Sequence, residues 1–67
     1  MTNLQRIRRE RGISQAELSA RVGINLRTLQ HYEQGDRAIN GAAVETVLRI
    51  ADELGCDPRE LIEKAEV

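Results

Sequence analysis

Apolar residues recur along this chain at helical spacing, and no stretch alternates apolar and polar residues at the period of two typical of a strand. Four times, an apolar residue that precedes a capping residue is followed by a second apolar residue five positions after the first. The sets are Ile13-Ser14 with Leu18, Ile24-Asn25 with Leu29, Ile39-Asn40 with Val44, and Cys56-Asp57 with Leu61. This spacing is the hydrophobic staple, in which the residue before the cap packs on the first turn of a helix.

Glycines mark where the predicted helices end, because a left-handed residue commonly closes a helix. They are Gly12, Gly23, Gly35 and Gly55. Capping boxes support two of the starts, at Ser14 with Glu17 and at Asp57 with Glu60, and Thr2 with Gln5 offers a weaker one. The pattern predicts an all-α fold in a single domain spanning 1–67. We expect five helices, at about 3–11, 15–22, 26–34, 41–54 and 58–65.

The second and third predicted helices are short and are separated by only Gly23, Ile24 and Asn25. Gly23 can turn the chain sharply and Asn25 can cap the next helix. Two short helices joined by a tight glycine turn predict a helix-turn-helix over residues 14–35. Any helical bundle contains similar turns between helices, so the prediction also depends on which residues the third helix exposes.

Projected at about 100° per residue, the third helix turns Leu29 and Tyr32 toward the core. Its opposite side holds Arg27, Gln30, His31 and Gln34, with Leu26 and Thr28 at the margins, and none of these is acidic. A merely solvated face is one interpretation. Such a face usually mixes glutamate with lysine, however, so the missing carboxylates favour contact with something negative.

The chemistry of this face suits the major groove of DNA. Arg27 can donate two bonds to guanine, and Gln30 or Gln34 can pair with adenine. Leu26 can contact a thymine methyl group, and His31 a base edge or a phosphate. No second histidine or cysteine is placed beside His31, so we expect no metal site.

Glu33 points toward the core and needs a partner. On the first helix, Arg8 lies on the same side as the buried Leu4 and Ile7. We predict an ion pair between Arg8 and Glu33 that joins the first helix to the third. The alternative is that both side chains extend into water.

Composition narrows the class of protein further. The chain has no Phe or Trp, and a core this small rarely contributes more than about 3–5 kcal/mol, so self-association would help. The net charge of −1 hides an asymmetry: residues 1–37 hold seven arginines and four carboxylates, a net of +3, whereas residues 38–67 hold three basic residues and seven carboxylates, a net of −4.

One histidine and one cysteine offer no catalytic constellation, so we expect neither an enzyme nor a cofactor. A polar N-terminus, the single Cys56 and the lack of a long apolar run predict a cytoplasmic protein without a membrane partner.

The segments ISQAELSARVGINLRTLQHYEQG and VETVLRIADELGCDPRELI resemble the Cro/C1-type (Xre) helix-turn-helix family of bacterial and phage regulators. The resemblance runs from about Leu4 to Ile62, and the joint spacing of its motifs is specific. It implies the five-helix, lambda-repressor-like fold. Relatives commonly dimerise through the region after helix three and the last helix, where the candidates are Leu48, Leu61, Ile62 and Val67. For Leu61, packing in the core is an equal alternative.

The resemblance also implies roles for individual positions. Leu26, Arg27, Thr28 and His31 would contact or flank bases, together with Gln30. Gln15 would contact a phosphate or support a base contact, and Arg37 would contact a phosphate. We place Asn25 and Asn40 among the phosphate contacts as well. We therefore expect a repressor that binds an inverted repeat of double-stranded DNA as a homodimer, without a small-molecule ligand. The alternative is a protein-interaction module, such as an antitoxin or a bridging coactivator.

Overall fold

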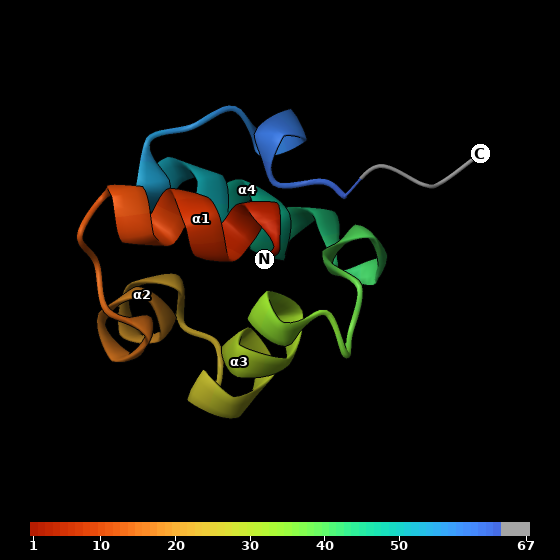
Figure 1. The fold of residues 1–67 in the computed structure, drawn as a ribbon, viewed down its shortest axis with the longest axis horizontal. Helices are drawn as coiled ribbons and strands as arrows, with labels where there is room; N and C mark the ends of the chain where they lie inside the picture. The colour runs from red at the N-terminus through yellow and green to blue at the C-terminus, as the bar shows by residue number, and fades with distance from the viewer. Residues whose placement is uncertain (64–67) are drawn as a thin grey trace.

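The computed structural model describes residues 1–63, and over this range the chain is helical, with no strand. Its elements are α1 (Asn3–Glu10), α2 (Gln15–Val22), α3 (Leu26–Gln34), the 3-10 turn η1 (Ile39–Gly41), α4 (Val44–Leu54) and the 3-10 turn η2 (Pro58–Glu60). In Figure 1, α2 and α3 lie together below α1 and α4. Helix α2 packs on both α3 and α4, α1 packs on α3, and α4 packs on η2. The all-α fold predicted from the sequence is confirmed.

Every α-helix contributes apolar residues to one core. The core residues are Leu4, Ile7, Leu18, Val22, Leu29, Tyr32, Ile39, Val47, Ile50, Ala51, Leu54 and Leu61. Ile13 and Ile24, the staple residues before α2 and α3, pack against this core together with Cys56. The spacing of apolar positions therefore buries one side of each helix and leaves the other exposed.

The helix starts follow the predicted caps at three of the staple positions. The Ser14 hydroxyl accepts a bond from the Glu17 N–H, and Asn25 Oδ1 accepts one from the Arg27 N–H. The capping box predicted at Asp57 is complete. At Ser14 only the serine half of the predicted box is present, and the Glu17 carboxylate pairs with Arg21 instead.

The predicted start of the fourth helix is wrong. Helix α4 begins at Val44, three residues after the expected position, and its N-cap Ala43 makes no side-chain cap. Asn40 does not cap a helix because its amide bonds both backbone groups of Glu63, donating to O at 2.7 Å and accepting from N at 3.0 Å. Val44, predicted to pack with Ile39 as a hydrophobic staple, is 73% exposed.

The predicted fifth helix is also wrong in extent, since η2 is a single 3-10 turn and four α-helices are present in residues 1–63. The backbone groups of residues 62 and 63 form hydrogen bonds with side chains from elsewhere in the chain, instead of the bonds of a continued helix. Asn3 Nδ2 donates to the Ile62 carbonyl at 3.2 Å, and Asn40 holds Glu63 as described. The expected end of that helix at residue 65, and Val67, lie outside the described residues.

The first helix ends at Glu10, one residue earlier than predicted. None of the helices within residues 1–63 has the length and apolar character needed to cross a bilayer.

Candidate nucleic-acid interface

A three-residue turn joins α2 to α3 and sets the direction of α3. Gly23 ends α2 with φ of 79° and ψ of 30°, a left-handed conformation that a residue with a Cβ rarely adopts. The N–H groups of Gly23 and Ile24 both donate to the Ser19 carbonyl, at 2.9 and 3.1 Å. Ile24 packs on the core and Asn25 caps α3. The turn is therefore held at its start by hydrogen bonds to the Ser19 carbonyl and at its end by the cap of α3.

Helix α3 separates a buried side from an exposed side. Leu29, Tyr32 and Glu33 are buried. The opposite side gathers the five residues predicted to contact bases: Leu26 and Arg27 are exposed, whereas Thr28, Gln30 and His31 are half-buried. Within residues 1–63, Arg27 enters no ion pair, and neither does Arg37 in the loop that follows α3.

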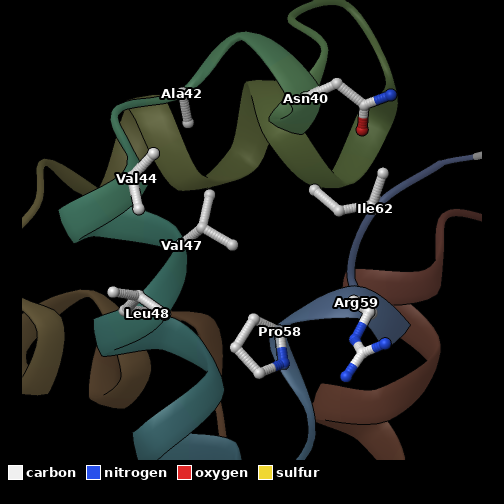
Figure 2. Close-up of a pocket in the computed structure, with 8 residues that line it drawn as sticks. All are labelled: Asn40, Ala42, Val44, Val47, Leu48, Pro58, Arg59 and Ile62. Atoms are coloured by element: carbon white, nitrogen blue, oxygen red, sulfur yellow. The ribbon is translucent and has the colours of Figure 1, made fainter.

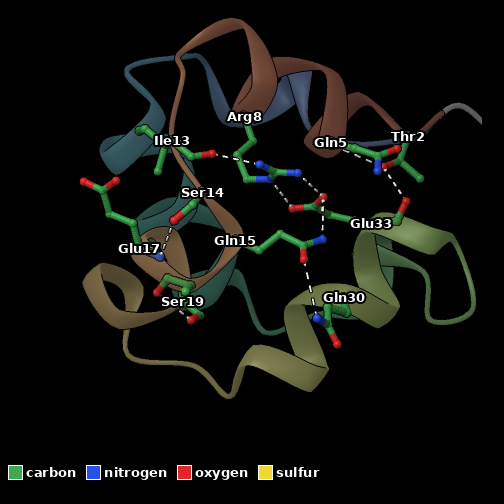
Figure 3. A network of polar contacts seen from close by, with 11 residues as sticks. Thr2, Gln5, Arg8, Ile13, Ser14, Gln15, Glu17, Ser19, Gln30 and Glu33 are labelled. Atoms are coloured by element: carbon green, nitrogen blue, oxygen red, sulfur yellow. Dashed lines mark hydrogen bonds and ion pairs between the residues drawn. The ribbon is translucent and has the colours of Figure 1, made fainter.

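The structure contains the ion pair between Arg8 and Glu33, which joins α1 to α3 (Figure 3). Arg8 Nε donates to Glu33 Oε2 at 2.6 Å, and Arg8 Nη2 donates to Glu33 Oε1 at 2.9 Å. The third contact of the guanidinium is with the Ile13 carbonyl, at 2.8 Å from Nη1. The Glu33 side chain is fully buried, so this two-pronged contact supplies the charge that burial requires.

Gln15 extends this pair to the exposed side of α3, which the sequence did not reveal. Its Nε2 donates to Glu33 Oε1 at 3.1 Å, and its Oε1 accepts from Gln30 Nε2 at 3.4 Å. Four side chains from three helices thus form one polar chain, running from Arg8 through Glu33 and Gln15 to Gln30 (Figure 3). The sequence did contain a signal for this contact, because Glu33 points inward and Gln15 is the first residue of the helix next to it.

A carboxylate missed by the sequence interpretation lies beside His31. The Asp36 Oδ2 atom is 3.2 Å from His31 Nδ1. The helix itself carries no outward acid, as predicted, but the loop after Gly35 folds back and brings Asp36 to its last turn. The backbone follows the same path, because the Arg37 N–H donates to the His31 carbonyl at 3.3 Å.

The residues predicted to contact phosphates are not all brought to this face. Gln15 and Asn25 lie at the N-termini of α2 and α3, and Arg37 is exposed in the following loop. Asn40 instead lines a separate apolar pocket beside α4 and η2 (Figure 2).

Other reactive groups lie away from the exposed side of α3. Cys56 is half-buried after α4, and burial, with a smaller contribution from the Glu60 carboxylate, raises the pKa of its thiol. The thiol is therefore protonated at neutral pH and a poor nucleophile. In the described part of the chain, no three metal-ligating side chains gather into a site.

Comparisons with known proteins agree with this geometry. A family model described as helix-turn-helix matches residues 4–61. The crystal structure of the restriction-modification controller protein C.AhdI from Aeromonas hydrophila is similar, with a TM-score of 0.77 and 28% sequence identity over 90% of this chain and 86% of that chain. Comparison with curated proteins finds no match.

Proposed function

The chain belongs to the Cro/C1-type helix-turn-helix family of DNA-binding transcriptional regulators, and we propose that it represses transcription by binding an inverted-repeat operator as a homodimer. The observation that carries the proposal is the exposed side of α3. It combines Arg27, which has no ion-pair partner within residues 1–63, with amide and imidazole groups that suit base edges.

In this proposal α3 enters the major groove with its N-terminal residues against the bases. Arg27 donates to a guanine, Gln30 pairs with an adenine, and Leu26 contacts a thymine methyl group. Thr28 and His31 flank these contacts. Asp36 beside His31 holds the ring in one orientation and disfavours phosphate at that point of the surface.

Phosphate contacts position the helix without selecting the sequence. Arg37 is exposed and suits this role, and the amide nitrogen of Asn25 is available because only its oxygen caps α3. Gln15 lies at the N-terminus of α2, where backbone N–H groups also favour an anion. A phosphate contact by Asn40 stays a prediction, and it would require release of the bonds to Glu63.

An apolar face on α4 and η2 supports the homodimer. Val44, Leu48 and Ile62 are 73%, 46% and 37% exposed and line a pocket of about 220 Å³ (Figure 2). Leu61, for which the interface and the core were equal alternatives, is 0% exposed and belongs to the core. A second copy covering this face would remove apolar surface from water and supplement a small core. Two recognition helices would then lie about 34 Å apart, one turn of DNA.

Repression follows from occupancy, since a dimer seated on a promoter excludes the polymerase sterically. The direct test is enrichment of bound sequences from a random pool of double-stranded DNA. The expected result is one inverted repeat with half-sites about 10 base pairs apart, bound with an affinity that falls steeply as salt rises. A pool without sequence preference at any salt concentration would contradict the proposal.

The same apolar face is also the feature that would serve a protein-interaction module. In that case the chain would bind a protein tightly and remain indifferent to DNA and to salt. The enrichment experiment separates the two functions, because only the regulator selects a sequence.

A further inference from the structure

His31 and Asp36 meet where the exposed side of α3 passes into the following loop. The Asp36 Oδ2 atom lies 3.2 Å from His31 Nδ1. The backbone places the carboxylate there, because the Gly35 and Arg37 N–H groups on either side of Asp36 both donate to the His31 carbonyl, at 3.1 and 3.3 Å. The path of the loop therefore brings Asp36 to the ring, and the contact does not depend on side-chain rotamers alone.

The chemistry of this contact determines which ring nitrogen carries the proton. A carboxylate oxygen only accepts hydrogen bonds, so His31 Nδ1 must be the donor. A neutral imidazole holds one proton on its two nitrogens, and the hydrogen bond of one nitrogen sets the state of the other. In the neutral ring of His31, Nε2 is therefore left with a free lone pair and can only accept.

We propose that Asp36 is a positioning residue that keeps the His31 proton on Nδ1, and that the free Nε2 atom then selects a base with an exocyclic amino group. In the major groove that group is N4 of cytosine or N6 of adenine, whereas guanine and thymine present the acceptors O6 and O4. A bare Nε2 accepts from the first two and is repelled by the others. This inference rests on the proposed DNA-binding function and names the base chemistry that one residue of α3 selects.

The surroundings of His31 favour a base over a phosphate as its outside partner. Phosphate oxygens are acceptors, so a ring that only accepts through Nε2 cannot bind them, and the Asp36 carboxylate repels the phosphate charge. The His31 side chain is 40% exposed, which leaves the ring accessible to DNA. It lies one turn after Arg27 on the same side of α3, the side that would face the groove.

The first measurement determines the tautomer directly. His31 is the only histidine in the chain, so the two imidazole nitrogen signals in NMR spectra of the labelled full chain belong to it. At about pH 8, where an ordinary imidazole is largely neutral, we expect Nδ1 to show the chemical shift of a protonated ring nitrogen and Nε2 that of a bare one. In Asp36→Ala, the proton should move largely to Nε2, because no carboxylate holds it on Nδ1.

The second measurement compares bases at the position that His31 contacts, which is identified as the one where His31→Ala abolishes the preference. The selected base should be cytosine or adenine, and its identity distinguishes the two sources of the amino group. An analogue that lacks only this amino group should weaken binding to the wild type about 2- to 12-fold, the range of one hydrogen bond. This loss is measured relative to His31→Ala, which corrects for the base-pair bond that the analogue also lacks.

Variants of Asp36 separate positioning from charge. In Asp36→Ala, Nε2 can carry the proton and donate to guanine or thymine, so the preference for the amino base should fall about 2- to 12-fold while other positions keep theirs. Asp36→Asn removes the charge but retains an oxygen that accepts from Nδ1, and it should keep the preference. Asp52→Ala removes an exposed carboxylate from α4 and should change neither the tautomer nor the preference. Circular dichroism confirms that each variant is folded.

The outcomes separate this inference from the function on which it depends. If the wild-type protein selects no sequence, the proposed function fails, whereas the NMR measurement still tests the tautomer. The inference is overturned if Nε2 carries the proton in the wild type, or if the position that His31 contacts selects guanine or thymine. It is overturned as well if His31→Ala abolishes the preference at no position, or if Asp36→Ala changes neither the tautomer nor the preference.

Discussion

Two leucines are left exposed on different faces of this small protein, and their surroundings differ. Leu26, 39% exposed, begins α3 and is followed by the polar Arg27 and Thr28. Leu48, 46% exposed, lies on α4 beside Val44 and Ile62, which are exposed as well. A single apolar group within a polar face suits a thymine methyl group, whereas a cluster suits another protein surface.

The same contrast extends below the surface. Behind the exposed side of α3, a chain of hydrogen bonds runs inward to the Arg8–Glu33 pair. Behind the apolar face, Val47 and Ile50 of α4 join the hydrocarbon core. Directional bonds orient the groups that would select a sequence, and undirected apolar contact suffices for association.

Removal of Glu33 should have the largest effect on this arrangement. Glu33→Ala leaves the Arg8 guanidinium buried without its partner and should lower the free energy of unfolding by about 3–5 kcal/mol. That is comparable to the whole stability expected of so small a core, so the variant should be largely unfolded at room temperature. Thermal unfolding followed by circular dichroism measures the loss.

A matched control removes a glutamate from an exposed pair. Glu17 pairs with Arg21 on the surface of α2, where both side chains are nearly half exposed. Glu17→Ala should therefore lower the free energy of unfolding by less than about 1 kcal/mol. Equal losses in the two variants would show that the buried pair contributes no more than a surface pair.

Substitution of the two leucines should separate the two faces. Leu48→Lys places a charge in the apolar face of each subunit and should raise the dimer dissociation constant about 30-fold, since roughly 1 kcal/mol is lost in each copy. Sedimentation equilibrium measures the change. Leu26→Lys should leave dimerisation intact and alter base preference instead. If Leu26→Lys dissociates the dimer while Leu48→Lys does not, the assignment of the faces is reversed.

Two glycines provide a smaller test of the turn before α3. Gly23→Ala forces a Cβ into a conformation with φ of 79° and should lower the free energy of unfolding by about 1–2 kcal/mol, although no atom within 4 Å obstructs the methyl group. Gly41 has equally open surroundings but no positive φ, so Gly41→Ala should leave stability unchanged or raise it by under about 1 kcal/mol. Chemical denaturation of both variants measures the difference, and equal effects would contradict a conformational role for Gly23.

Much of the fold could be predicted from the sequence because its signals are local. Caps, staples and terminal glycines act within about five residues, and they located α2 and α3 closely. The sequence misplaced the start of α4 because Asn40, a good cap in isolation, bonds Glu63, which lies 23 residues away. The extent of the last helix failed for the same reason.

For the site, too, the local patterns were predictable and the contacts between distant residues were not. Helical projection collected the exposed residues of α3 and suggested Arg8 as the partner of Glu33, because both face the core. It could not supply the contact between Gln15 and Gln30, which lie 15 residues apart on two helices. Nor could it place Asp36 beside His31, since the path of a loop depends on tertiary packing.

In the proposed function, the exposed side of α3 selects the DNA sequence. The most direct measurement is the ratio of affinities for the enriched operator and a scrambled duplex of the same length, in the wild type, Arg27→Ala and Arg37→Ala. Loss of a two-pronged contact to guanine should reduce the ratio roughly 5- to 150-fold in Arg27→Ala. Arg37→Ala should weaken both duplexes equally and leave the ratio unchanged. A wild-type ratio in Arg27→Ala, or a reduced ratio in Arg37→Ala, would contradict this role of α3.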